Sequence, residues 1–534
     1  MNPFRTPLIT LLLVPLVLSV PLHAETIAGH EVRLDAGGKI VPWYSPTTKA
    51  YDQFLRQRWN FIKTSVPVLP SGHPLYYFCN GFSSTEPAIS VDKAMNDVGE
   101  KIPNWFESAR LYYAYTGDTN VMDIVRRLID YAIAHGTSPS SFAWPNFPHT
   151  TTRADDTEFE GFTPNFAKHE VQLDHAGEMG LTYFRLWQFT GEPNYLTHAL
   201  HVADALAMQA RVGTATRSVW PYRVKLDDGE IKAEYGANWI GCYALLDSLV
   251  TTGCGNTGVY FRARELTRDF MLKFPMKTGC WTDGHSDNGV NSHTYKSNMS
   301  KSNTALYLFD HPEFDPDWRT HIPMLIAWTE TNFVYRTTGG EPAEAFGAQI
   351  VGEQDGFNFK MDYQTARHAA ECARWFAASG DARYREKAYR CLNWVTYCSD
   401  GKGRATESPY SLNIATWWSD CYGECPRMFY HVFAAVPEWA PPGEDHILFS
   451  EGILADVSYR SGEVRYTARD RTGTEYLRLS FRPAAVTLSN APLAWNERPL
   501  DGGDYAVTIH RKEAGQVRIA GNRQPSTQGE GEPR

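Results

Sequence analysis

The sequence predicts a mainly helical protein, built as a ring of helical hairpins and followed by a small antiparallel β-sandwich. Between about residues 46 and 437, apolar residues recur at helical spacing and are interrupted by short turns. After the proline-rich stretch 437–442, apolar and polar residues alternate with a period of two. Because 43% of the 534 residues are hydrophobic, the chain can bury more than one core.

The first 24 residues have the pattern of a secretory signal. Arg5 precedes an apolar run from about Leu8 to Val20, and Ala24 stands at the expected cleavage point. This run is shorter than the roughly 20 residues that span a bilayer, and no later segment is longer and equally apolar. We therefore expect residues 1–24 to be removed and the protein to be secreted or periplasmic, with no membrane span.

The helical region, expected to occupy residues 25–440, is organised as hairpins. The turns at 116–118, 190–192 and 379–381 each contain a glycine followed by an acidic residue. Glycine ends one helix in the left-handed conformation, and the acidic side chain favours the start of the next helix. Weaker turns near 253 and 311 give a spacing of roughly 60 to 75 residues, longer than the repeats of tetratricopeptide or HEAT proteins.

Two further hairpins are expected at the ends of this region, around residues 51–64 and 416–436, which makes six or seven in total. The pattern resembles the (α/α)6 or (α/α)7 toroids of carbohydrate-active enzymes. This resemblance implies a sugar-active cleft, but it does not specify a reaction.

The β-sandwich is expected over residues 445–520. Its predicted strands contain the alternating stretches 447–449, 454–459, 463–468, 476–481 and 505–509. The last segment, 521–534, is polar and rich in Gly, Pro and Glu, so we expect it to be disordered.

Charge and cysteine content narrow the class of protein. The 51 basic and 61 acidic residues give a net charge of −10, which argues against nucleic acid or an anionic membrane surface as a partner but leaves an anionic substrate possible. The nine cysteines are an odd number, so at least one is unpaired. Cys421 and Cys425 have no second pair at zinc-site spacing, so we expect no metal and no cofactor. The oligomeric state is left open.

A short motif suggests a first type of chemistry. The segment Gly236-Ala237-Asn238-Trp239 resembles one in the chondroitin AC and hyaluronate lyase family, part of a superfamily that includes alginate lyases. The resemblance implies that Asn238 binds the uronate carboxyl group, that His285 or His293 is the base and that Tyr295 is the acid. His285, His293 and Tyr295 lie 47, 55 and 57 positions beyond Asn238, and the spacing does not decide between the two histidines.

Aromatic and cationic residues near this motif are candidates for substrate binding, either by stacking on sugar rings or by holding neighbouring uronates. The competing interpretation is that they are core residues or plain surface charge. The candidates are Trp220, Tyr222, Arg223, Lys225, Trp239, Lys296, Lys301, His169 and His175.

A second group of residues indicates acid–base chemistry by carboxylates. Glu170, Asp174 and Glu178 are spaced four residues apart, so we expect them on one helix face. They can be the acid–base carboxyl groups of a hydrolase, they can line the edge of a substrate site, or they can form ion pairs with Arg and Lys of the next hairpin. Later carboxylates that can supply the partner for inverting hydrolysis are Glu353, Asp355, Asp362, Asp420 and Glu424.

From the sequence we expect a secreted polysaccharide lyase that cleaves a uronic-acid-containing polysaccharide, such as glucuronan, alginate or a glycosaminoglycan, by β-elimination. The first alternative is a six-hairpin glycoside hydrolase acting on uronate-bearing glycans. The second is a glycan-binding protein without catalytic activity.

Overall fold

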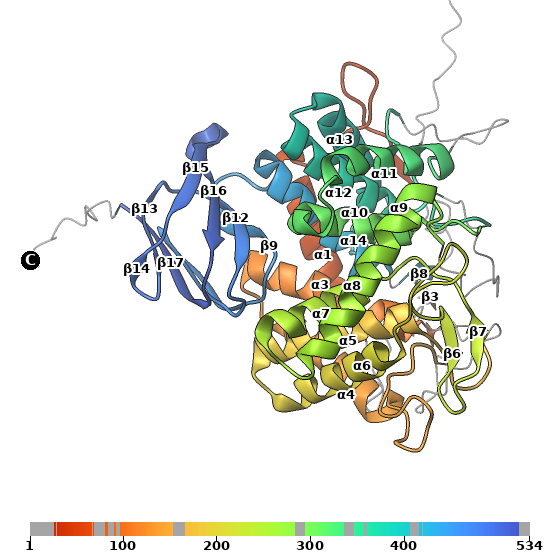
Figure 1. Cartoon of the computed structure of the whole chain (residues 1–534). Helices are drawn as coiled ribbons and strands as arrows, with labels where there is room; N and C mark the ends of the chain where they lie inside the picture. The colour runs from red at the N-terminus through yellow and green to blue at the C-terminus, as the bar shows by residue number, and fades with distance from the viewer. Residues whose placement is uncertain are drawn as a thin grey trace, which may run out of the picture.

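A computed structural model of the 534-residue chain shows a helical ring with a β-sandwich beside it (Figure 1). The structure describes residues 26–27, 29–66, 68, 81–83, 90–91, 97–152, 166–282, 294–335, 346–356, 360–405, 416–418 and 420–522. The predicted signal segment and nearly all of the predicted disordered tail lie outside these residues.

Six helices form an inner ring, in which each contacts the next and the last contacts the first. They are α3 (Val98–Thr116), α5 (Leu173–Thr190), α7 (Ile240–Thr252), α10 (Asn298–Asp310), α12 (Asp362–Ser379) and α14 (Asp420–Ala435). An outer helix packs against each of them: α4 (Asn120–Gly136), α6 (Pro193–Gln209), α8 (Thr257–Lys273), α11 (Trp318–Asn332), α13 (Ala382–Val395) and α1 (Ala50–Ser65). The fold is therefore an (α/α)6 toroid, which confirms the predicted fold class.

The expected hairpins at the two ends of the helical region are wrong as separate units. Each of these segments contributes one helix, α1 and α14, and these two helices pack against each other. The sixth hairpin is thus assembled from opposite ends of the region and closes the ring.

The glycine turns between inner and outer helices are confirmed. Gly117, Gly191, Gly253 and Gly380 follow α3, α5, α7 and α12 with φ of 77°, 77°, 74° and 75°. The N–H of Gly117, for example, donates to the carbonyl of Tyr113 at 2.7 Å. Glycine adopts this left-handed conformation without the steric cost that a Cβ brings, so each helix stops at the predicted place.

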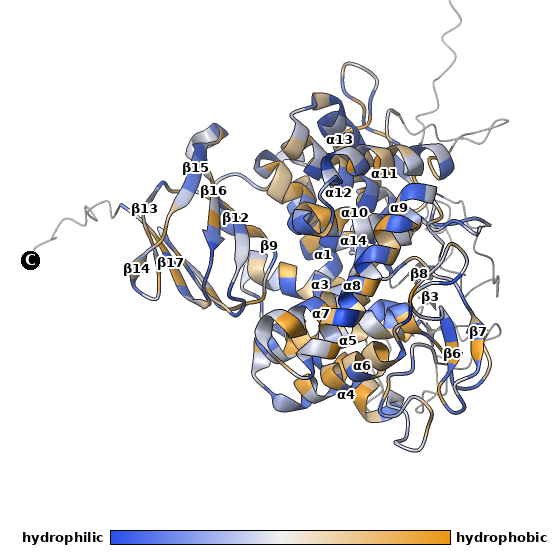
Figure 2. Cartoon of the chain, in the orientation of Figure 1, coloured by the Kyte–Doolittle hydropathy of each residue, from blue (hydrophilic) through white to orange (hydrophobic). Residues whose placement is uncertain are grey.

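Inner and outer helices differ in their burial. In α12, every residue from Asp362 to Arg374 is buried. In the outer helix α4, only one face is buried, and α4 and α6 carry both hydrophilic and hydrophobic residues (Figure 2). Polar side chains on the inner helices therefore need partners inside the ring, because water cannot reach them freely.

The β-sandwich consists of two antiparallel sheets. One contains β10 (Leu454–Arg460), β11 (Glu463–Ala468), β17 (Gly515–Gly521), β13 (Pro483–Leu488) and β14 (Ala491–Pro492) in spatial order. The other contains β15 (Trp495–Pro499), β16 (Tyr505–Arg511), β12 (Gly473–Leu479) and β9 (His446–Ser450). Strands β13, β14, β15 and β17 were not predicted, and Gly521 belongs to β17 rather than to a disordered tail.

The sandwich docks on the carboxyl-terminal ends of inner helices. Arg110 of α3 donates to the carbonyl of Ser450 at 3.0 Å, and the backbone N–H of Val457 donates to the hydroxyl of Tyr113 at 3.0 Å. His446 contacts the carbonyl of Tyr115 at 2.7 Å. This end of the ring is therefore covered by the sandwich.

The amino-terminal ends of the inner helices carry two small sheets. One contains β5 (Glu170–Gln172), β6 (Arg223–Lys225) and β7 (Ile231–Ala233), and the other contains β4 (Ser90–Val91), β3 (Gly81–Ser83) and β8 (Thr416–Trp418). The remaining elements are β1 (Thr26–Ile27), β2 (His30–Glu31), α9 (Pro275–Thr278) and short 3₁₀ turns at 47–49, 312–314, 437–439 and 501–503. Within the described part of the chain, no helix combines the length and hydropathy needed to cross a membrane.

Candidate active site

Carboxylates gather where the inner helices begin. Glu100, Asp174 and Asp420 lie in the first turns of α3, α5 and α14. Glu178 and Glu424 follow one turn later in α5 and α14. The positive end of a helix dipole favours acidic groups at such positions.

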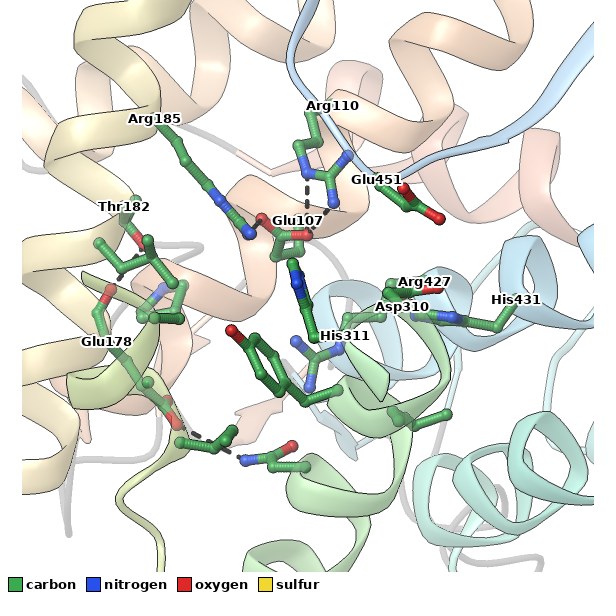
Figure 3. A pocket seen from close by; sticks show the side chains of 18 of the residues that line it. Glu107, Arg110, Glu178, Thr182, Arg185, Asp310, His311, Arg427, His431 and Glu451 are labelled. Atoms are coloured by element: carbon green, nitrogen blue, oxygen red, sulfur yellow. Dashed lines mark hydrogen bonds and ion pairs between the residues drawn. The ribbon is translucent and has the colours of Figure 1, made fainter. Parts of the chain in front are cut away.

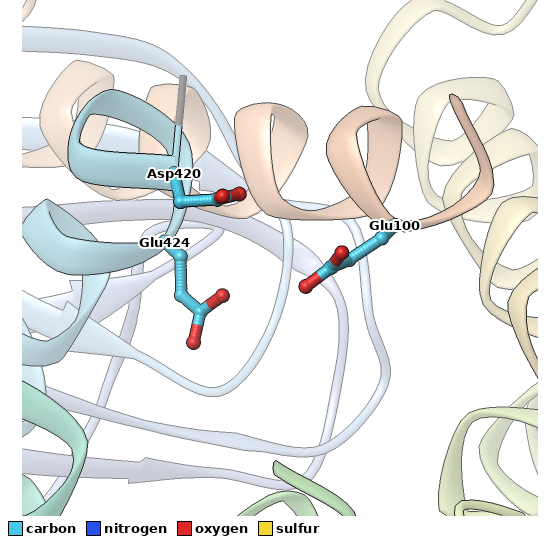
Figure 4. Close-up of side chains that lie close together, drawn as sticks. All are labelled: Glu100, Asp420 and Glu424. Carbon is cyan, nitrogen blue, oxygen red and sulfur yellow. The ribbon is translucent and has the colours of Figure 1, made fainter. Parts of the chain in front are cut away.

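Glu100, Asp420 and Glu424 form one cluster, which we name the rim cluster (Figure 4). One oxygen atom from each carboxyl group lies within 4.8 Å of the others. Two cations bind this cluster. Lys101 pairs with Asp420 and lies 3.3 Å from Glu100, and Arg367 of α12 pairs with Glu424. Three carboxyl groups with two cations carry one excess negative charge, which a single proton removes.

The protonation of the rim cluster follows from this imbalance. Burial, together with the neighbouring Asp97 and Glu424, raises the pKa of Glu100 to about 7. Burial, together with Glu100 and Glu424, raises the pKa of Asp420 to about 7 as well. Because each carboxyl group raises the pKa of the other, the two titrate as a pair. Their side chains keep 12% and 9% exposure, whereas Glu424 is fully buried, so only the first two are accessible to a ligand.

A second carboxylate pair, Asp174 and Glu178, lies on α5. The amide nitrogen of Asn238 donates to both, at 3.2 and 3.3 Å, and the carbonyl oxygen of Asn238 accepts from Asn303 of α10 at 3.2 Å. Burial raises the pKa of Glu178. The prediction that Glu170 shares this face is wrong, because Glu170 lies in strand β5 and pairs with Arg223 at 3.2 Å.

An ion pair links the start of α3, which carries Glu100, to α5, which carries Asp174 and Glu178. The Asp97 carboxylate caps α3 by accepting the N–H of Glu100, and it contacts His175 at 3.1 Å. Although burial alone would favour the neutral forms, this mutual attraction lowers the pKa of Asp97 and raises that of His175 well above its usual value. His175 is thus a buried cation bound to a carboxylate.

The predicted lyase residues are only partly described. Asn238 precedes α7 and Tyr295 precedes α10, so both lie at the amino-terminal end of the ring. His285 and His293 lie outside the described residues. Asn238 is 1% exposed, and its amide group is engaged on both sides by Asp174, Glu178 and Asn303.

Several predicted substrate-binding residues are buried, which corrects their assignment. Trp220 and Trp239 are fully buried and pack against each other with their ring centroids 5.4 Å apart. The hydroxyl of Tyr222, which is 1% exposed, accepts from Gln172 at 3.0 Å. These aromatic rings fill the core and present no surface to a sugar.

The predicted cations are also engaged within the protein. Lys301 is fully buried and bonds both oxygens of Glu371 at 2.7 Å. Other pairs are Arg223 with Glu170, Lys225 with Asp228 at 3.0 Å, and Lys296 with Asn332 at 2.8 Å. His169, at a φ of 65°, contacts His149 at 3.3 Å.

The remaining predicted carboxylates and cysteines have structural roles. Asp362 pairs with Arg58 at 3.0 Å, and Asp355 accepts the backbone N–H of Lys296 at 2.9 Å. The backbone carbonyl of Glu353 accepts from Asn298 at 2.7 Å. Cys421 and Cys425 are buried, and the thiol of Cys421 donates to the Asp362 carboxylate at 3.3 Å.

Sequence reasoning missed Glu100, Lys101, Asp97 and Arg367. The segment Asp97 to Glu100 has the D-x-x-E spacing of a helix start, and this signal predicts the beginning of α3. It does not indicate that Glu100 faces Asp420.

Comparisons with known proteins add the following findings. No family model matches the sequence, and no curated protein matches it. Among solved structures, the chain is similar to a cellobiose 2-epimerase from Spirochaeta thermophila, at 10% identity and a TM-score of 0.49, covering 72% of this chain and 98% of that one. It is also similar to a D-mannose isomerase, at 11% identity and a TM-score of 0.49, covering 74% and 99%. A heparin-specific unsaturated glucuronyl hydrolase matches at 10% identity and a TM-score of 0.44, covering 72% and 96%. The assignment of the fold rests on the closed ring of helices itself.

Proposed function

We propose that this protein is a glycoside hydrolase in which Glu100 and Asp420 are the acid–base carboxyl groups. The observation that carries the proposal is the rim cluster, in which two carboxyl groups, 12% and 9% exposed, lie close together and burial raises the pKa of each to about 7. Glycoside hydrolysis needs one protonated and one ionised carboxyl group beside the same bond. The resemblance of the toroid to carbohydrate-active enzymes supports a sugar as the substrate.

The two groups would act in sequence. The protonated carboxyl group gives its proton to the glycosidic oxygen, and the ionised one forms a bond to the anomeric carbon as the leaving sugar departs. Water then attacks that carbon, gives its proton to the first group, and releases the second. The short separation of the carboxyl groups fits this retaining mechanism better than an inverting one, in which a water must fit between them.

Lys101 would hold the ionised partner in place, because its ammonium group contacts both Asp420 and Glu100. Burial of the site strengthens these interactions, since little water screens them.

The hydrolase is favoured over the lyase by the surroundings of Asn238. A lyase needs this amide to neutralise a uronate carboxylate, but Asp174 and Glu178 already accept from it. The amide nitrogen has two hydrogens, and both are already used, so none is left for a uronate carboxylate.

The test uses purified protein and a panel of neutral and uronate-bearing oligosaccharides. We expect new reducing ends without the ultraviolet absorbance of an unsaturated uronate, and the product should retain its anomeric configuration by NMR. Glu100→Gln and Asp420→Asn should each lower kcat/KM by about 10²- to 10⁴-fold, with little change in melting temperature.

The control variants are Asp269→Asn on the exposed side of α8 and Tyr295→Phe, and both should remain active. Absorbance that rises with the reducing ends, together with an inactive Tyr295→Phe, would establish β-elimination instead.

A further inference from the structure

Inside the ring, between the rim cluster and the β-sandwich, lies a cavity of about 170 Å³ (Figure 3). It is lined by α3, α5, α7, α10 and α14 and by β9 with the turn that follows it. This space is far larger than the roughly 10–15 Å³ that one water molecule needs. Lining residues such as His311 and Arg185 are partly exposed, with side chains 37% and 25% accessible, so a small ligand can enter.

Arg427 of α14 is the central polar residue of this cavity. Its Nε is buried and has no hydrogen-bond partner. Among the described residues its guanidinium group has no hydrogen bond or ion pair, although Glu424, Glu107 and Glu178 lie near enough to attract it. The residue itself is partly exposed, and a cation in such a place without an ion pair is unfavourable unless a ligand or substrate pairs with it.

The other charged groups do not neutralise Arg427. Glu107 lies between Arg110, at 2.8 Å, and Arg185, so one carboxylate serves two guanidinium groups. Asp310 is paired with Arg374. The lining holds three arginines and four carboxyl groups, so its net charge depends on the ionisation of Glu178 and Glu451.

Two more carboxyl groups line the cavity, but burial draws both toward their neutral forms. Burial raises the pKa of Glu178, and burial together with Asp310 raises the pKa of Glu451 to about 7. They are therefore weak counter-ions for Arg427 and are suited to hydrogen-bonding a hydroxyl group.

Neutral polar groups complete the lining. His431 has a buried Nδ1 without a partner, and burial lowers its pKa to about 3, so the ring is uncharged at neutral pH. Tyr307 also lines the cavity, and its ring stacks on that of His311 with centroids 4.2 Å apart. These groups can donate to and accept from the hydroxyl groups of a ligand.

We propose that this cavity is a second ligand site, which binds a small hydroxy-carboxylate no larger than a single sugar acid, with Arg427 pairing its carboxylate. The planar guanidinium matches a carboxylate bidentately, and the neutral lining matches hydroxyl groups. An inorganic anion would leave the neutral groups unpaired, and a neutral sugar would leave Arg427 unpaired. The proposal does not depend on the hydrolase assignment, because binding is measured without turnover.

The experiment is isothermal titration of the full-length protein with D-glucuronate, D-glucose and inorganic phosphate. We expect D-glucuronate to bind at least 10-fold more tightly than either of the others. The absence of D-glucuronate binding, or equal binding of glucose or phosphate, would overturn the proposal.

Variants locate the site. Arg427→Met should weaken D-glucuronate binding by about 10- to 100-fold, whereas Arg126→Gln, which removes a surface cation on α4, should leave it unchanged. Asp420→Asn should also bind normally, because it changes only the rim cluster. Binding that survives Arg427→Met but is lost in Asp420→Asn would place the ligand at the rim cluster and overturn the proposal. If Arg427→Met does not fold, Arg427→Lys keeps the charge but not the bidentate geometry and should weaken binding about 10-fold.

Discussion

The rim cluster and the inner cavity are neighbours in which burial acts on groups of opposite charge. Glu424 belongs to the first and Arg427 to the second, and both lie on α14 less than one helical turn apart. The rim cluster has more carboxylates than cations and holds a proton. The lining of the cavity holds three arginines and four carboxyl groups, of which burial draws Glu178 and Glu451 toward their neutral forms. Burial, with Arg367 nearby, lowers the pKa of Arg427 to about 10. The same burial therefore acts on both sites, and the number of partners decides how each one responds.

The largest expected effect comes from removing an arginine that has a partner. Arg367→Met leaves the fully buried Glu424 without its cation, and we expect a loss of roughly 3–5 kcal/mol in unfolding free energy. Arg427→Met removes a cation without an ion-pair partner, so its unfolding free energy should be unchanged or higher. Urea denaturation of both variants at pH 7 measures the difference, and equal losses would contradict the contrast between the two sites.

A smaller effect is expected in the pH dependence of stability. In the folded protein the pKa values of Glu100 and Asp420 are about 7, above the values of the same groups in the unfolded chain. Between the unfolded-state and the folded-state pKa values, the folded protein therefore binds an extra proton. Stability should therefore fall as pH rises through this window, by about 3 kcal/mol for one proton. Asp420→Asn should reduce this fall, and Asp269→Asn should not. Thermal melts from pH 5 to pH 8 would refute the extra proton if all three proteins gave the same slope.

The smallest expected effect concerns the wall between the two sites. A Cβ at Gly241 would lie 2.3 Å from Cγ of Glu178, so Gly241→Ala should displace Glu178 and cost roughly 1–3 kcal/mol. A Cβ at Gly258, in α8, meets nothing within 4 Å, so Gly258→Ala should stabilise the protein by up to about 1 kcal/mol. Equal melting temperatures for the two variants would show that Glu178 is not held against α7.

The local features of the fold were predictable. Each glycine turn combines a residue that tolerates positive φ with an acidic residue, and both properties act within a few residues. The strand pattern of β10 and β11 was equally visible, because alternation is local. In β13 the exposed residues beside Val486 are alanines, so apolar and polar residues do not alternate, and β17 was missed although its buried and exposed residues do alternate.

The candidate site was less predictable. Asp420, Glu424 and Glu178 were named from the sequence, but Glu100 was not, and the partner of each was unknown. The aromatic residues Trp220 and Trp239 were misread as a sugar platform. An aromatic ring beside polar residues looks the same in sequence whether it faces the core or solvent, and only packing distinguishes the two.

The sequence by itself determined where the inner-to-outer helix turns lie and that a β-sandwich follows the helices, because backbone preference and hydrophobic periodicity act over a few residues. Only the tertiary structure decided that α1 closes the ring with α14 and that Lys101 meets Asp420, 319 residues away. It also decided that Glu424 has an ion-pair partner, whereas Arg427 has none within the described part of the chain. The ionisation of these groups depends on their burial and on charged residues from distant helices, and neither can be predicted from the spacing of residues along the chain.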